Sequence, residues 1–257
     1  MLNHYRPRET KWTFDNGITP DGAFTITSLS RLQAGQQVYD SYGKKCNSRF
    51  LLNYGFAVDH NVDPDGQCHN EVRVSFRMQG REDDPHYDTK LGLLNGASSS
   101  RGIRVSSWLD LESTREAFSF LRFVYARGSE LLLLPQLGEN YELGKKPIPP
   151  ISCGNEVKVL SALQHAMATQ LAKYPTTLEE DLATLEAGTY PFGSDRRNAI
   201  VILKGEKQVC HHYLQLAELC IPLLQLDYRD AKKRLQSRKR STDDIEKYVS
   251  KVVVLLL

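Results

Sequence analysis

The sequence has few cysteines, and their spacing excludes two common ways of stabilising a core. The five cysteines are an odd number and include no C-x-x-C pair. This argues against a disulfide framework and a closed structural zinc site, and it favours a reducing compartment. The run Cys210-His211-His212 does not restore a zinc site, because adjacent residues on a helix point about 100° apart.

Long apolar runs and a charge imbalance are also missing. The longest apolar run, Val252 to Leu257, has six residues, whereas a helix needs about 20 to cross a bilayer. The N-terminus, MLNHYRPRETKW, lacks the apolar segment of a signal peptide. With 33 Lys and Arg against 31 Asp and Glu, the net charge of +2 gives no general attraction to nucleic acid or membrane lipid. We therefore expect a soluble, intracellular monomer in the cytoplasm, nucleus or chloroplast.

One strongly basic segment runs from Arg229 to Arg240. Such a segment suits an acidic partner or nucleic acid. A solvated helix end is the simpler interpretation, and we do not expect nucleic acid to be a partner. The final SKVVVLLL shows no clear periodicity. We expect residues 237–257 to form a basic and apolar tail that is poorly ordered.

The first part of the chain, Met1 to about Met78, has the pattern of short strands. Runs of β-branched and aromatic residues, KWTF, AFTITSL, QQVYDSY and NEVRVSFRM, alternate with turn signals such as Asn16-Gly17 and Pro64 to Gly66. One helix interrupts the strands. It is SRFLLNYG, with Asn47 as its N-cap and Gly55 at its end.

A polar, loop-like stretch from Gln79 to Gly102 separates this part from a helical one. Capping residues, a proline-rich break at residues 145–150 and the spacing of apolar residues set the helix bounds. We expect helices over Leu109 to Arg127, Asn155 to Tyr174, Thr177 to Glu186, and Arg196 to about Gln236 with an interruption at Pro222. A β-rich unit followed by a helical unit predicts an α+β protein.

The most informative segment is GQQVYDSYGKKCNSRFLLNYGF. A strand delivers Tyr42 to a tight turn at Gly43, and the following helix returns Tyr54 and Phe56 on either side of Gly55. Glycines beside aromatic residues allow the backbone to approach a ligand closely. Residue types alone nevertheless favour a role in the core, because large aromatic side chains are usually buried.

Three motifs in order carry a family resemblance: Leu2-Asn3-His4 followed by Pro7, then GQQVYDSYG, then NSRFLLNYGF. Together they resemble the second half of a SET-domain methyltransferase, in the branch related to the Rubisco large-subunit lysine methyltransferase. Later segments, among them NEVKVLSALQHAMATQLAKYPTTLEED, are similar to that family's substrate-binding domain. The resemblance implies a C-terminal SET part over residues 1–62 and a substrate-binding domain over residues 63–236, mostly helical after about residue 105.

The resemblance also implies roles for single residues. Tyr42 stands at the methyl-transfer channel and is the expected catalytic residue. Phe14 falls where the family often has a tyrosine that lines the lysine channel, and Tyr54 faces the target side chain. These two residues and Tyr42 are therefore the expected substrate-binding residues. The expected cofactor-binding residues are Leu2, Asn3, His4, Tyr54, Gly55 and Phe56.

For function, the resemblance implies a protein-lysine N-methyltransferase that uses S-adenosyl-L-methionine, needs no metal and has a protein with a target lysine as its partner. One relative modifies histidine instead. The chain contains no G-x-G and begins at the Asn-His motif. We therefore expect it to lack the N-terminal half of the SET domain, which grips the methionine end of the cofactor. The alternative is a catalytically inactive protein-binding module made of the helical domain.

Overall fold

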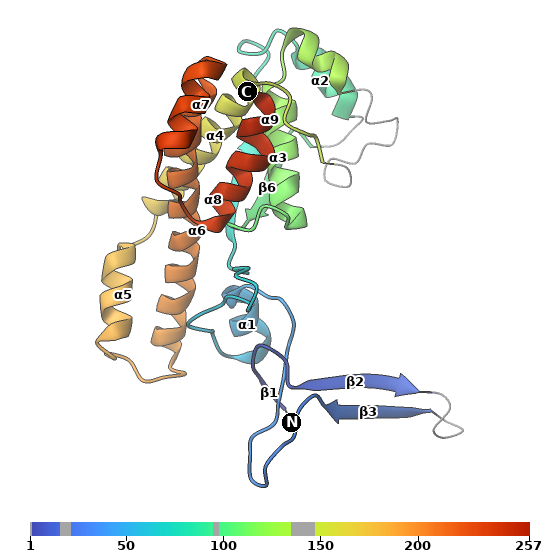
Figure 1. The fold of residues 1–257 in the computed structure, drawn as a ribbon, viewed down its shortest axis with the longest axis vertical. Helices are drawn as coiled ribbons and strands as arrows, with labels where there is room; N and C mark the ends of the chain where they lie inside the picture. The colour runs from blue at the N-terminus through green and yellow to red at the C-terminus, as the bar shows by residue number, and fades with distance from the viewer. Residues whose placement is uncertain (1, 16–21, 95–97, 135–146) are drawn as a thin grey trace. The chain divides into compact units, whose positions relative to one another are not determined.

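The computed structural model describes residues 2–15, 22–94, 98–134 and 147–257. The chain folds into two compact units, residues 1–69 and residues 70–257 (Figure 1). Strands dominate the first unit and helices the second, so the α+β class expected from the sequence is confirmed. The expected turn at Asn16-Gly17 and the start of the proline-rich break lie outside the described residues.

Over its described residues, the first unit contains four short strands and one helix. Strand β1 (Asn3–His4) runs parallel to β4 (Tyr39–Asp40), and β2 (Thr10–Asp15) pairs antiparallel with β3 (Ala23–Ser28). Of the strand expected in QQVYDSY, only the two residues of β4 pair with a neighbour. The helix α1 (Asn47–Tyr54) follows.

Asn47 does not cap α1, contrary to our expectation. The N-cap is Cys46, and Asn47 is the first helical residue. The Asn47 side chain instead bonds both backbone groups of Val58, with each donor and acceptor 2.9 Å apart. Gly55 ends the helix as expected, with a φ of 78° that favours glycine.

The second unit opens with two antiparallel strands whose connection contains a helix. Strand β5 (Val72–Arg77) pairs antiparallel with β6 (Ser100–Val105), and α2 (Tyr87–Leu94) lies between them in the chain. The loop expected over Gln79 to Gly102 is therefore wrong. Its polar residues include a buried ion pair, Lys90 with Asp84 at 2.8 Å. Local composition does not distinguish such interior residues from polar residues of a surface loop.

Further helices follow along the chain, and several of them contribute to one apolar core. These further helices are α3 (Glu112–Tyr125), the short 3-10 helix η1 (Gly128–Leu133), α4 (Cys153–Leu171), α5 (Leu178–Glu186), α6 (Asp195–Leu224) and α7 (Tyr228–Ser237). Helix α6 packs against both α4 and α5 (Figure 1). Among the described residues, none of these helices has the length and apolar character needed to span a bilayer.

Two helix ends differ from the expected ones, while a third agrees. Helix α4 begins at Cys153 because Ser152, not Asn155, is the N-cap. Pro222 lies inside α6, and the chain breaks only before α7, where Asp227 accepts the backbone N–H of Asp230. The capping box of Thr177 and Glu180 forms as expected.

The poorly ordered tail expected over residues 237–257 is wrong. Residues 243–256 form helix α8 (Asp243–Tyr248), the π-helical turn η3 (Val249–Val253) and α9 (Val254–Leu256), and η3 packs against α6. Ile245, Tyr248 and Val253 are buried in the core. Tyr248, the buried Val249 and Val253 lie three, four and eight residues after Ile245, which is a helical spacing. The run of valines and leucines masks this period in the sequence.

Candidate functional site

Five aromatic rings of the first unit converge and form what we call the aromatic cluster: His4, Tyr42, Phe50, Tyr54 and Phe56. The ring centres are 4.5 Å apart for Tyr42 and Tyr54, 4.8 Å for His4 and Phe50, and 5.4 Å for Phe50 and Phe56. Phe50 is completely buried, and the other four rings are partly exposed. Phe50 is therefore the buried member of the aromatic cluster, and the other four rings remain accessible to solvent.

The backbone and the hydroxyl of Tyr42 are both fixed by the segment around β1. Its backbone N–H donates to Nδ1 of His4 at 3.0 Å, and its hydroxyl donates to the carbonyl oxygen of Leu2 at 2.7 Å. The next residue, Gly43, has a φ of 88°, which a side chain would strain. Because β1 and β4 pair in parallel, the Asn-His motif lies directly beside the strand that delivers Tyr42.

His4 is an uncharged hydrogen-bond acceptor in this arrangement. Burial lowers the pKa of His4 below its ordinary value, and the nearby charges of Arg6 and Lys45 lower it further. Since Nδ1 accepts the Tyr42 N–H, the proton of the neutral ring is on Nε2. The His4 side chain therefore fixes the backbone of Tyr42, a role that the resemblance did not imply.

A group of charged side chains centred on Asp63 fastens the segment after α1 to the segment after β1. The carboxylate is 2.8 Å from Arg6, 2.8 Å from His69 and 3.3 Å from Lys44. Burial alone would raise the pKa of Asp63, but the hydrogen bond from His69 and the charges of His69 and Arg6 outweigh it and lower this pKa. These charged residues around Asp63 could not be predicted from the sequence, because they come from separate segments and follow no motif.

The expected site residues fall into two groups. One group comes together in the structure: Leu2, His4, Tyr42, Tyr54 and Phe56. Phe50 was not expected from the sequence, and its ring contacts those of His4, Tyr54 and Phe56. Gly55 turns the chain between the last two rings.

Asn3 and Phe14 lie differently. Asn3, on β1, pairs with Tyr39 of β4, and the side chain of Asn3 is exposed. Phe14 is on the β2–β3 hairpin opposite Phe24 and is 63% exposed. Among the described residues it makes no ring contact with the aromatic cluster. Nor do the described histidines, cysteines and carboxylates form any group of three that would bind a metal ion.

Comparison with known proteins identifies the second unit. Residues 81–209 match the family model described as Rubisco LSMT substrate-binding. This match covers half of the chain and lies within the unit of residues 70–257.

Curated relatives extend the match beyond that domain. The chain is 31% identical over 199 residues to actin-histidine N-methyltransferase of Gallus gallus, and 30% identical over 199 residues to the protein of that name in Homo sapiens. Each alignment covers 74% of this chain and 31% of the relative. The chain thus spans about a third of the length of these curated relatives.

Solved structures agree over almost the whole chain. The SET domain of LSMT bound to lysine and AdoHcy has a TM-score of 0.61 and 25% identity, covering 96% of this chain and 55% of that one. Rubisco LSMT bound to sinefungin and monomethyllysine gives a TM-score of 0.58 at the same identity and coverage. The family expected from the three sequence motifs is therefore confirmed. The chain belongs to the Rubisco LSMT substrate-binding family, and over most of its length it is similar to LSMT-like SET methyltransferases.

Proposed function

We propose that this protein is an S-adenosyl-L-methionine-dependent protein N-methyltransferase that modifies a side-chain nitrogen of a protein substrate. Its family, the activity named for its curated relatives and the AdoHcy bound by a similar LSMT structure support this proposal. The single observation that carries it is the arrangement around Tyr42, where motifs from three parts of the first unit meet in one aromatic cluster.

The residues of the aromatic cluster fit the adenosine and sulfonium parts of the cofactor. Phe56 and Tyr54 offer partly exposed aromatic faces, which stack well on a base and attract a cation. The lowered pKa of His4 keeps its ring uncharged, so it does not repel the sulfonium. No carboxylate belongs to the cluster, so nothing in it would pair with a protonated amine and oppose loss of the proton.

Tyr42 is suited to orient the acceptor nitrogen. When bound, S-adenosyl-L-methionine supplies the electrophilic methyl group. The acceptor must then lie in line with the methyl and the sulfur, and such orientation supplies a large part of the acceleration. Because the Tyr42 hydroxyl donates its proton to Leu2, its oxygen keeps lone pairs for an N–H of the acceptor. Tyr42 thus positions the nitrogen without acting as a strong base.

The acceptor expected from the resemblance was lysine, yet the curated relatives are named as histidine methyltransferases. The similar LSMT structures, in contrast, hold lysine or monomethyllysine. Our proposal therefore specifies a side-chain nitrogen and makes the residue type a result of the assay. Actin and Rubisco, the proteins named for the relatives, are the first substrates to use.

The test is methyl transfer by the wild-type protein, the Tyr42→Phe variant and a Tyr39→Phe control. Tyr39 is on β4, three residues from Tyr42, and its ring contacts Tyr5 outside the aromatic cluster. Mass spectrometry of digested substrate identifies the methylated residue as histidine or lysine. We expect Tyr42→Phe to slow transfer by about 100-fold with cofactor affinity nearly unchanged, and Tyr39→Phe to change it by less than about threefold.

Two results would contradict the proposal. One is undiminished transfer by Tyr42→Phe. The other is a folded wild-type protein that binds neither S-adenosyl-L-methionine nor transfers a methyl group. The second result would favour the inactive binding module that the sequence leaves as the alternative.

A further inference from the structure

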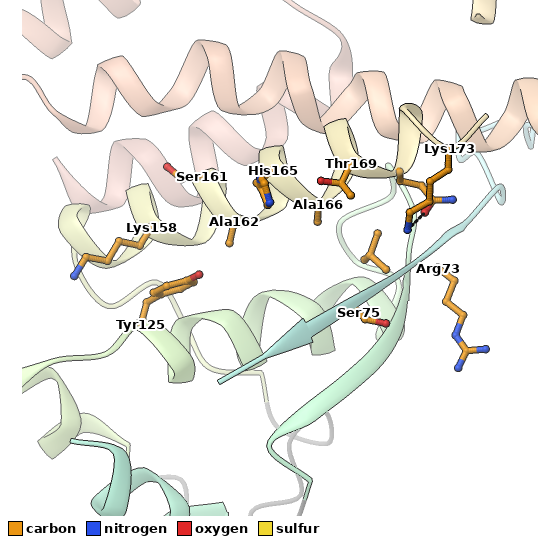
Figure 2. A pocket seen from close by; sticks show the side chains of 12 residues that line it. Arg73, Ser75, Tyr125, Lys158, Ser161, Ala162, His165, Ala166, Thr169 and Lys173 are labelled. Atoms are coloured by element: carbon orange, nitrogen blue, oxygen red, sulfur yellow. Dashed lines mark hydrogen bonds between the residues drawn. The ribbon is translucent and has the colours of Figure 1, made fainter. Parts of the chain in front are cut away.

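A long groove with basic ends lies in the second unit, between α4 and strand β5 (Figure 2). Its volume is about 640 Å³. One wall is a face of α4 from Lys158 onward, continued by Lys173 in the turn just after the helix. Arg73, Val74 and Ser75 of β5 form the other wall. Tyr125, at the end of α3, closes the side near Lys158.

The residues of α4 that line the groove repeat at helical spacing. Small side chains, Ala162 and Ala166, lie at the middle of the wall, and His165 points from the helix between them (Figure 2). The span from Lys158 to Lys173 is fifteen residues, or about 22 Å along a helix. An extended peptide of about seven residues has the same length.

The charges of the groove have one sign. Arg73, Lys158 and Lys173 line it, and none of the twelve lining residues is an aspartate or glutamate. All three cations are exposed, and among the described residues none has a carboxylate partner. The ammonium group of Lys173 donates to the side-chain oxygen of Gln170, at 3.4 Å (Figure 2). The groove therefore attracts a negatively charged ligand.

The backbone of β5 has hydrogen-bonding capacity on the side away from β6. The N–H of Met78 donates to the carbonyl of its partner Ser99, which makes these two residues a hydrogen-bonded pair. In an antiparallel ladder such pairs alternate, so the backbone groups of Arg73 and Ser75 point away from β6. Within the described part of the chain these outward groups have no hydrogen-bond partner, and both residues line the groove.

We propose that this groove binds an acidic, extended stretch of a protein, which adds to the open edge of β5 as a third strand. An open strand edge supplies backbone hydrogen bonds to such a peptide, and neighbouring pockets supply selectivity. Basic residues on an edge normally deter pairing with other strands, but they favour a strand that carries carboxylates. That the stretch belongs to the methylated protein rests on the proposed function, whereas its binding to the groove does not.

The test uses a fluorescein-labelled heptapeptide of alternating glutamate and valine, and fluorescence polarisation with the complete protein. The same peptide with lysine in place of glutamate is the charge control. A third peptide carries N-methyl groups on alternate backbone nitrogens, which removes the hydrogen bonds that an added strand makes. We expect binding of the first peptide only.

Two variants in the groove and one control variant on α7 locate the binding. The double reversal Arg73→Glu with Lys173→Glu should weaken the affinity by about 10-fold or more, since each exposed pair contributes modestly and each reversal adds repulsion. Lys232→Glu with Lys233→Glu changes the net charge equally on the exposed side of α7 and should leave the affinity within about twofold. Ser75→Pro removes an outward N–H without touching the ladder to β6, and it should abolish binding.

The proposal is wrong if the acidic peptide does not bind or if the lysine peptide binds equally well. Equal effects of the two double variants would also contradict it. If the N-methylated peptide binds as tightly as its parent, strand addition is excluded. That peptide is tested on the wild-type protein, so the result stands even if Ser75→Pro fails to fold. Peptide binding and methyl transfer are measured separately, so the failure of one proposal does not hide the outcome of the other.

Discussion

The two units of this protein differ in how much of their apolar surface they bury. The second unit buries an apolar core together with three ion pairs whose side chains are almost completely enclosed: Arg122 with Glu156, Lys90 with Asp84, and Lys207 with Asp181. The first unit leaves large apolar side chains in solvent on the β2–β3 hairpin, where Trp12 and Phe24 are 55% and 61% exposed. Its order rests on the aromatic cluster and on the side chains around Asp63.

This difference indicates where each unit tolerates change. A buried ion pair is costly to break because one charge is left without a partner, whereas a concentration of exposed apolar surface usually marks a contact or ligand site. We therefore expect the second unit to respond strongly to the loss of one buried charge. The first unit should respond mainly to changes at the few residues that hold its aromatic rings.

The largest effect is expected at Glu156. Its carboxylate accepts two hydrogen bonds from Arg122, at 2.7 and 2.9 Å, and a third from the Tyr248 hydroxyl. Glu156→Gln should lower the free energy of unfolding of the second unit by about 3–5 kcal/mol. The control is Asp110→Asn, which removes an exposed pair with Lys251 and should cost less than about 0.5 kcal/mol. Denaturant unfolding measures both, and equal costs would refute the contrast.

The next effect concerns the first unit. Phe50 is fully buried beneath the rings of the aromatic cluster, while Leu52 on the same helix is 83% exposed. Phe50→Ala should destabilise this unit by about 3 kcal/mol and weaken cofactor binding, while Leu52→Ala should change neither. Hydrogen exchange of α1 and β4 amides reports the stability. Normal protection in Phe50→Ala would show that the cluster does not hold the unit together.

A smaller effect separates two glycines of the second unit. A Cβ on Gly205 of α6 would lie 2.4 Å from the side chain of Asn70, whereas a Cβ on Gly92 of α2 would meet nothing within 4 Å. Gly205→Ala should therefore destabilise by about 1–3 kcal/mol through overpacking. Gly92→Ala should stabilise by about 0.5–1 kcal/mol through helix propensity. Thermal unfolding decides, and stabilisation by both variants would mean that Asn70 moves away without cost.

The smallest effect is a pH dependence at the Tyr42 amide of the first unit. The pKa of His4 is lowered, chiefly by burial, so its contribution to stability is complete above the unfolded value of about 6.5. As the pH falls from 6.5 toward the lowered pKa, the ring gains a proton and Nδ1 can no longer accept the Tyr42 N–H.

Exchange of the Tyr42 amide, corrected for its intrinsic rate, should accordingly quicken between pH 7.5 and pH 5. His4→Asn keeps a short acceptor that does not titrate and should remove this dependence. A Tyr42 amide that is equally protected at both pH values would show that His4 is not the group that holds it.

The sequence allowed prediction of features that depend on neighbouring residues. The capping box of Thr177 and Glu180 and the glycine that ends α1 are local signals, and both formed as expected. The three ordered motifs were enough to indicate the family. Of the expected site residues, the rings of Tyr42, Tyr54 and Phe56 come together because a strand, a turn and a short helix bring them back along the chain.

What escaped prediction depends on contacts between distant residues. The polar stretch containing α2 hides a buried lysine whose partners, Asp84 and the carbonyl of Val124, cannot be recognised from local composition. The final helices resemble a tail in sequence because their contacts are distant: Ile245 and Val253 enter the apolar core, and Tyr248 donates to Glu156, 92 residues earlier. The clamp of His4 on Tyr42 likewise joins residues 38 positions apart.

The central claim is that the aromatic cluster binds S-adenosyl-L-methionine, and calorimetry of this binding tests it most directly. Wild-type protein is compared with Phe56→Ala, in the cluster, and with Phe14→Ala, on the exposed hairpin. We predict measurable binding by the wild-type protein, an affinity about 10-fold lower in Phe56→Ala from the loss of stacking, and no change in Phe14→Ala. Absence of binding by the folded protein, or equal affinities of wild type and Phe56→Ala, would contradict the claim.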